Sequence, residues 1–376
     1  MSRRSPGSAL APVLVLVLGS VIIVTAACGG SDWGFLKLSS TREPEETVKF
    51  VPVSKNTLTF QQLTSVTLPD HGELIVEIGG GSGAPGNFMP YPGGLIYGTS
   101  GNRLLRYDIV SKTIEYISLP YPTIVDITAL AALADGSLLG AMLSDGGESS
   151  FFTYQPKDNS FADIGSKLSG GIVLSLVATG DLTAYFGTDE GKFYLLDVES
   201  GDATEIATFP LGRAVTALTH DKGTNRIYGM PGFSYSIDDP GTGVTELSGL
   251  ASVSEPVYDL VTKDGVIYFG GFHTGEIYRY DPETDEVETL GSPDPEGLAL
   301  RVRGIALAGD YLYGVADGGE LNRFQGYLFR FSLTEKVPAG LLKLNGGPVG
   351  FKSVCKGEDG LIYTQVGGSF LRFGSR

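Results

Sequence analysis

The stretch GLIYGTSGNRLLRYDIVSKTIEYI at residues 94–117 returns in altered form as GVIYFGGFHTGEIYRYDPETDEVETL at residues 265–290. Each copy has an apolar segment that ends at a glycine, a glycine-containing loop, a second segment that ends in Arg-Tyr-Asp, a turn and a third apolar segment. Short apolar runs bounded by Gly and Asp predict β-strands joined by hairpins. A chain that repeats this unit is built from copies of one small sheet.

Weaker copies fill the rest of the chain and fix the size of the repeat. A small-residue segment precedes each unit, so that every repeat of roughly 43 residues contains four strands, the size of a propeller blade. We therefore predict an all-β, seven-bladed β-propeller of four-stranded antiparallel blades, with small residues in the inner strands because they crowd around the axis. The glycines that mark the register are Gly98, Gly140, Gly187, Gly229, Gly270 and Gly314, with Thr364 in the seventh copy; the matched inner-strand residues are Ala129, Ser175, Ala217, Gly304 and Ser353.

The last repeat ends at Arg376 after only three strands. Upstream, TLTFQQL at residues 57–63 precedes ELIVEI, which we expect to be the first inner strand. The prediction is that this N-terminal strand completes the last blade and leaves no open sheet edge. In the turns, Asp197 and Asp281 are expected to accept backbone N–H groups and close their hairpins.

The N-terminus has the features of a secretory signal. Arg3 and Arg4 precede an apolar run that ends at VTAACGG, residues 24–30. TAAC resembles the lipobox of bacterial lipoproteins, and that resemblance implies cleavage before Cys28 and a lipid on its thiol. Two alternatives stay open: a plain signal peptide that leaves Cys28 unmodified, and a transmembrane anchor.

This interpretation divides the chain into a lipoprotein signal peptide (1–27), a tether (28–45) and the propeller domain (46–376). It places the protein in the bacterial cell envelope, held by its lipid on the outer side of the cytoplasmic membrane or on the outer membrane. The other cysteine, Cys355, lies in an apolar segment and is expected to be a buried small hydrophobic residue.

The net charge of −16 argues against nucleic acid as a partner, because phosphate backbones are repelled. The three histidines show no metal-ligand spacing, and the chain has no GxSxG, P-loop or CxxC motif. No catalytic residue and no cofactor are therefore assigned, although Ca²⁺ or another divalent metal stays open. The expected partners are the membrane and a protein or small-molecule ligand, and the expected state is a monomer.

Seven such modules behind a lipobox resemble bacterial propeller lipoproteins of the WD-repeat, YVTN and quinoprotein-like group. The chain departs from these patterns, because no blade contains a tryptophan and the Gly-His and Trp-Asp pairs are missing. Streptogramin B lyases have a similar blade size, but their recurrent Leu-Trp-Phe-Thr-Glu strand is absent. Gluconolactonase-type propellers hold a divalent metal in the axial channel, for which only Asp126 and Asp259 stand near inner strands.

Propeller ligands usually meet the face formed by the loops that enter the inner strands and those that join the second and third strands. Two copies of DGGE, residues 145–148 and 317–320, either place carboxylates around one opening or form simple glycine hairpins. The arginines of ALRVRG either bind a carboxylate or phosphate or form salt bridges to acids of the neighbouring blade. The candidate ligand-binding residues are Asp126, Arg213, Phe272, His273, Arg301, Arg303, Glu320 and Lys352.

These observations favour a binding module that uses its loop face. The alternative is a metal-dependent lactonase, lyase or hydrolase with its site at the mouth of the axial channel.

Overall fold

The computed structural model describes residues 15–18, 21–24, 71–76, 85–168, 171–180, 182–210, 213–294, 300–318, 326–343, 349–366 and 369–374. The chain separates into two units, residues 1–46 and 47–376. In the first unit, β1 (Val15–Leu18) and β2 (Val21–Val24) pair antiparallel. Cys28 and the predicted tether lie outside the described residues. No helix in the described part of the chain is long and apolar enough to cross a membrane.

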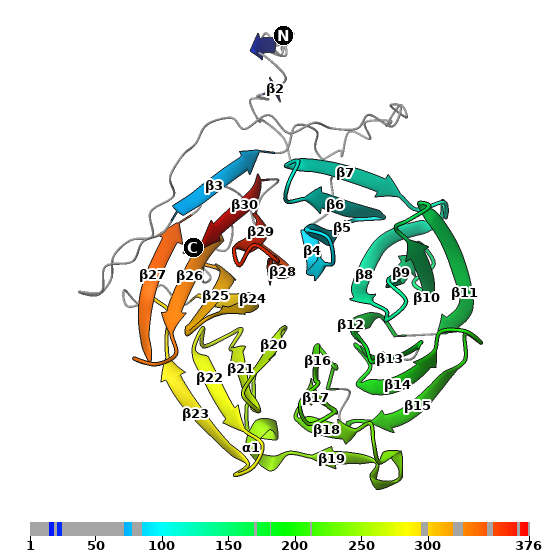
Figure 1. Cartoon of the computed structure of the whole chain (residues 1–376), viewed down its shortest axis with the longest axis vertical. Helices are drawn as coiled ribbons and strands as arrows, with labels where there is room; N and C mark the ends of the chain where they lie inside the picture. Colours follow the sequence, from blue (N-terminus) through cyan, green and yellow to red (C-terminus); the bar gives the residue numbers. More distant parts are fainter. Residues whose placement is uncertain are drawn as a thin grey trace, which may run out of the picture. The chain divides into compact units, whose positions relative to one another are not determined.

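The second unit is an all-β propeller of four-stranded antiparallel blades, and Figure 1 shows the blades arranged around a common centre. Six blades consist of four consecutive strands each, with the first strand innermost. The first three are β4 (Pro85–Tyr91), β5 (Leu95–Ser100), β6 (Arg103–Asp108) and β7 (Thr113–Ser118); β8 (Ile124–Ala132), β9 (Leu138–Ser144), β10 (Ser149–Gln155) and β11 (Ser160–Leu168); and β12 (Val173–Ala178), β13 (Thr183–Thr188), β14 (Lys192–Asp197) and β15 (Ala203–Thr208). The next three are β16 (Ala217–Asp221), β17 (Arg226–Met230), β18 (Phe233–Ser236) and β19 (Val244–Glu246); β20 (Leu260–Lys263), β21 (Val266–Gly270), β22 (Ile277–Asp281) and β23 (Glu286–Gly291); and β24 (Arg301–Ala308), β25 (Tyr311–Asp317), β26 (Gly326–Ser332) and β27 (Val337–Lys343).

The remaining sheet joins the two ends of the second unit. It contains β28 (Val349–Lys356), β29 (Ile362–Val366) and β30 (Ser369–Gly374), with β3 (His71–Val76) antiparallel to β30. The expectation that ELIVEI forms the first inner strand is wrong, because most of this segment is β3 and the inner strand of the first blade is β4. The inner strand was missed because its sequence, PGNFMPY, has two prolines and no apolar alternation. The segment 57–63, predicted to complete the last blade, lies outside the described residues.

Two short helices lie in the blade formed by β16–β19 and in the connection that follows it. They are the 3₁₀ helix η2 (Pro240–Thr242) and α1 (Ser248–Ala251). Among the described strands from β4 to β27, the outer strand of each sheet is followed in chain order by the inner strand of the next sheet, as the regular spacing of the repeats predicts.

The glycine of each second strand has a packing reason. A Cβ on Gly140 would lie 2.2 Å from Cε1 of Phe152, which stands directly opposite on β10. A Cβ on Gly314 would lie 2.1 Å from Cζ of Phe329, the residue opposite on β26. At Gly270 the obstructing side chain is Val302 of the next blade, 2.3 Å away. Glycine therefore recurs because a neighbouring side chain occupies the space of its missing Cβ.

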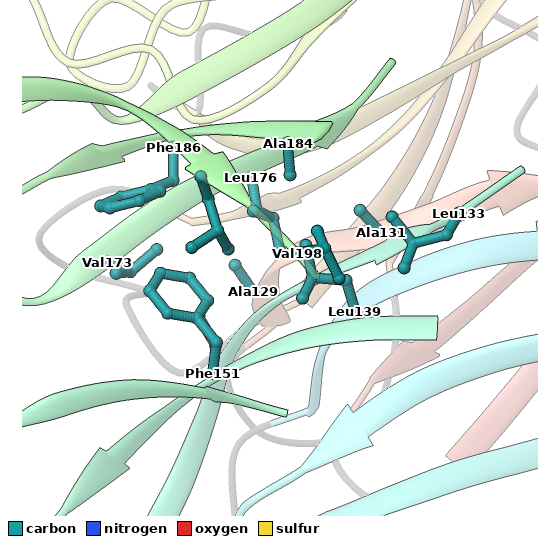
Figure 2. Packing of buried hydrophobic residues seen from close by; sticks show 12 residues of the cluster. Ala129, Ala131, Leu133, Leu139, Phe151, Val173, Leu176, Ala184, Phe186 and Val198 are labelled. Carbon is teal, nitrogen blue, oxygen red and sulfur yellow. The ribbon is translucent and has the colours of Figure 1, made fainter. Parts of the chain in front are cut away.

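The core lies between neighbouring blades. Figure 2 shows one such layer, in which side chains from β8–β10 face side chains from β12–β14. The equivalent layer between the last sheet and the first contains Cys355, which is 5% exposed, so its prediction as a buried hydrophobic residue is confirmed. Burial also raises the pKa of the Cys355 thiol, which keeps it protonated and unreactive. In the layer between β8–β10 and β12–β14, Figure 2 labels Ala129, Ala131, Leu133, Leu139, Phe151, Val173, Leu176, Ala184, Phe186 and Val198.

Aspartates close several hairpins as predicted. Oδ1 of Asp197 accepts the backbone N–H groups of Glu199 and Ser200, at 3.0 and 2.8 Å. Oδ1 of Asp281 accepts the N–H of Glu283 at 3.1 Å. These bonds lower the pKa of both carboxyl groups, because they stabilise the ionised form.

Candidate functional site on the loop face

The face that carries the starts of the inner strands and the loops between second and third strands is called the loop face below. At its edge, Arg303 of β24 donates from Nε and Nη2 to Oδ2 of Asp317, at 2.6 Å each. Asp317 ends β25 and is 2% exposed. The ladder between β24 and β25 shifts register between Val302 and Gly304, so Arg303 occupies a bulge, a feature that redirects side chains. Arg303 is thus neutralised within its own blade.

Aromatic rings from the neighbouring blade support both arginines. The guanidinium carbon of Arg303 lies 4.6 Å from the ring centre of Phe272, and that of Arg301 lies 5.4 Å from the same ring. Tyr258 packs edge-on against Phe272, with 5.1 Å between ring centres. These four residues are called the arginine–aromatic patch. It joins the β20–β23 blade to the β24–β27 blade on the loop face.

Glu255 holds the loop that carries Phe272. Its Oε2 accepts the backbone N–H groups of His273 (2.7 Å) and Thr274 (3.0 Å). Its Oε1 accepts the hydroxyls of Thr274 (2.7 Å) and Tyr278 (2.9 Å). Burial raises the pKa of Glu255, but these four hydrogen bonds outweigh it, so the pKa lies below its usual value. The carboxylate is ionised at neutral pH, and its hydrogen bonds hold this loop in place.

A pocket of 260 Å³ opens beside this loop, between the β16–β19 and β20–β23 blades; it is called the loop-face pocket. Apolar groups from both blades form most of its wall, and Glu255 links it to the arginine–aromatic patch. Its lining residues are Arg213, Ala214, Thr216, Met230, Pro231, Val253, Ser254, Glu255, Pro256 and Val257.

A second cavity of 340 Å³ lies among the inner strands, with residues of β4, β8, β12, β16, β20, β24 and β28 in its wall. Asp259 is part of that wall, and its Oδ2 accepts the N–H of Ile305 from the next blade at 3.0 Å. Similar bonds link other neighbouring inner strands: Ser175 Oγ to Val215 O at 2.7 Å and Thr216 Oγ1 to Val257 O at 2.5 Å. Asp259 therefore belongs to a series of links that bind blade to blade.

The structure brings together Phe272, His273, Arg301 and Arg303, and places Arg213 in the adjoining pocket. Asp126 stands apart on β8, where burial raises its pKa to about 6 against the lowering effect of the Ile127 N–H. Lys352 lies on β28, and Glu320 falls outside the described residues.

The two DGGE copies are not equivalent. In the first, Ser144 and Glu148 close a hairpin through the Ser144 N–H to Glu148 O bond of 2.9 Å. In the second, Asp317 is buried against Arg303. Within the described residues no three His, Cys, Asp or Glu side chains are placed to hold a metal ion.

Sequence reasoning missed Tyr258, Thr274 and Tyr278 as members of this region. Asp317 was placed on the loop face, but its pairing with Arg303 was not predicted, because that arginine lies 14 residues away on the paired strand. The antiparallel register sets Arg301 opposite Asp317, whereas the ion pair is made by Arg303 at the bulge. Tyr258 carries no local signal, because its role depends on the loop of the next hairpin.

Comparisons with solved structures show the fold. The chain is similar to a streptogramin B lyase (TM-score 0.61, 15% identity, 81% of this chain and 97% of that one). It is also similar to the extracellular domain of a putative hybrid two component system from B. thetaiotaomicron (0.57, 12%, 88% and 43%) and to the WD40 repeats of RRP9 (0.58, 12%, 85% and 100%). No protein-family model and no curated protein matches the chain. At these identities the likeness establishes the β-propeller alone.

Proposed function

We propose that this chain is a binding propeller of the bacterial envelope, which holds an anionic group of a protein or small-molecule partner on its loop face. The observation that carries the proposal is Arg301, a cation supported by an aromatic ring with no carboxylate paired to it among the described residues. The neighbouring Arg303 differs, since Asp317 neutralises it.

Physical chemistry favours an anion at this position. A guanidinium over an aromatic face keeps its charge, and the ring restricts its motion, so its donors are oriented for a planar carboxylate or phosphate. Arg303 and Phe272 form the support, because the first is fixed by Asp317 and the second is fixed by the loop around Glu255. A binding group on a rigid scaffold loses less entropy when the ligand arrives.

Among the similar structures, one is described as a streptogramin B lyase and another as the WD40 repeats of RRP9. No observation among the described residues favours the metal-dependent alternative, since Asp317 pairs with Arg303 and Glu255 accepts hydrogen bonds from the loop that carries Phe272.

The proposal includes the lipid anchor predicted at Cys28. Cys28→Ala should abolish lipid attachment and move the protein from the membrane fraction to the soluble fraction. Cys355→Ser is not a suitable control, because Cys355 packs in the core; Ser31→Ala, three residues past Cys28, changes neither cysteine. Persistent attachment of the Cys28 variant would show that another segment holds the protein.

We also infer that β3 completes the seventh blade, because six of its residues pair with β30 in continuous register from His71 to Val76. This pairing supports closure of the ring by the N-terminal part of the domain, through a segment downstream of the one predicted from the sequence. Closure of this kind protects the edge of β30 from pairing with other chains.

The anion proposal is tested by titrating the full-length protein, labelled with ¹⁵N at arginine, with acetate, malonate and phosphate. The Nε–H signal of Arg301, assigned by its loss in Arg301→Gln, should shift and saturate at millimolar concentration with at least one anion. Arg279, which pairs with Asp281 at 2.9 Å, is the internal control and should shift little. Equal shifts at both arginines, or none at Arg301, would contradict the proposal.

A further inference from the structure

We propose that the loop-face pocket is a separate site for a small hydrophobic monocarboxylate, with the carboxylate on Arg213 and the apolar body between the two blades. This goes beyond the proposed function, because it concerns a different pocket and a different ligand from the anion on Arg301.

The wall of the pocket selects an apolar body. Six of its lining side chains are apolar, and Met230 and Val257 are buried at its base. The volume of 260 Å³ lies just below the range of about 300–1,000 Å³ for drug-sized ligands, so the occupant is smaller, such as one ring or one branched chain. The apolar lining residues are Ala214, Met230, Pro231, Val253, Pro256 and Val257.

The wall is also held in place before a ligand arrives. Thr216 donates to the carbonyl of Val257 at 2.5 Å and ties the two blades together beneath the pocket. Pro231 and Pro256 restrict the backbone on the two sides. A pocket that is already ordered spends little of its binding free energy on rearrangement.

Arg213 is the single basic residue in the described lining, and it is exposed. No carboxylate pairs with it in the part of the chain that the structure describes, although Glu255 lines the same pocket. The reason is that Glu255 is directed to the other side, toward His273, Thr274 and Tyr278. The pocket therefore offers one guanidinium with no direct carboxylate partner beside an apolar surface, while the Glu255 carboxylate is held by the loop that carries Phe272.

The state of Glu255 decides between two classes of ligand. Three donors from Thr274 and His273 already bind its two oxygens, and the Tyr278 hydroxyl is shared between Glu255 and Glu276, so little of the acceptor capacity of the carboxylate is left. An ammonium group brought into the pocket would find the Glu255 carboxylate already engaged, with only weaker neutral acceptors beside it, and would lose its hydration. The site should therefore prefer a simple carboxylate to the zwitterion of a hydrophobic amino acid.

The experiment uses isothermal titration calorimetry of the full-length protein with four probes: 3-phenylpropionate, its neutral amide, L-phenylalanine and acetate. We expect 3-phenylpropionate to bind at least tenfold more tightly than each of the other three. Loss of the charged hydrogen bonds in Arg213→Gln should weaken 3-phenylpropionate by 10- to 100-fold and leave the amide unchanged. Val253→Phe, which fills the pocket, should weaken the carboxylate and the amide alike.

Arg226→Gln is the matched control, since Arg226 is also exposed and begins β17, at the opposite end of the strands from the loop face. Arg301→Gln should leave 3-phenylpropionate binding unchanged, so that failure of this inference and failure of the proposed function are distinguishable. Equal binding of the amide, equal binding of L-phenylalanine, an unchanged affinity in Arg213→Gln or no binding of 3-phenylpropionate at 10 mM would each overturn the inference.

Discussion

The register glycines allow the sharpest test of the propeller packing. Gly140→Ala places a Cβ 2.2 Å from Cε1 and 2.3 Å from Cζ of Phe152, far inside van der Waals contact. The ring cannot move away freely, because Phe152 is fully buried and packs against Phe161 with 5.8 Å between ring centres. Overpacking of this kind costs about 1–3 kcal/mol, and the lower entropy of the unfolded alanine chain returns about 0.4–1 kcal/mol. We expect a net loss of about 1–2 kcal/mol in the free energy of unfolding.

The measurement is denaturant unfolding followed by circular dichroism, supported by a fall in Tm of about 2–3 °C. Gly146→Ala is the control in the same blade, because its Cβ would meet only Ser144 Oγ at 3.7 Å, an ordinary contact. It should change stability by less than about 0.5 kcal/mol.

The double variant with Phe152→Leu removes the ring that causes the clash. Its destabilisation should therefore be smaller than the sum of the two single changes. Strict additivity, or a Gly140→Ala protein as stable as the wild type, would refute the packing explanation of the repeat.

Four other predictions follow from single contacts. Because burial raises the pKa of Asp126 to about 6, the native state binds more protons than the unfolded chain between about pH 4 and pH 6, and stability falls as pH rises through this window. Asp126→Asn should remove this dependence. In urea unfolding at pH 7.5 the variant should be more stable by about 1–2 kcal/mol, after allowance for partial exposure of the carboxyl group. Glu255 has the opposite sign: its lowered pKa gives stability that is complete above about pH 4.5 and is lost as pH falls, so Glu255→Gln should flatten the acid limb of a Tm–pH curve. Asp317→Asn leaves Arg303 without its carboxylate and should cost about 3 kcal/mol, and a loss below 1 kcal/mol would show that solvent replaces the pair. Deletion of residues 47–76, which removes β3, should lower Tm strongly while deletion of residues 57–63 should not, and equal Tm values would contradict closure by β3.

The sequence by itself determined the features that depend on neighbours along the chain. The blade period and the hairpin aspartates Asp197 and Asp281 were predicted because strand alternation and turn hydrogen bonds involve residues a few positions apart, and the second-strand glycines were predicted from their recurrence once per blade. The burial of Cys355 was also predicted, since the cysteine lies in an apolar strand-like segment.

The tertiary structure alone decided the contacts between segments that are distant in the chain. Which segment pairs with β30 could not be predicted, because ELIVEI suits an inner and an outer strand equally well and only the register of the closed sheet distinguishes them. The sequence presented Arg301 and Arg303 as equals, whereas a bulge and a partner 14 residues away neutralise one of them. The loop-face pocket depends on two blades and on the hydrogen bonds that engage Glu255. Such features arise from packing between blades. The sequence of one repeat does not show how the next blade packs against it.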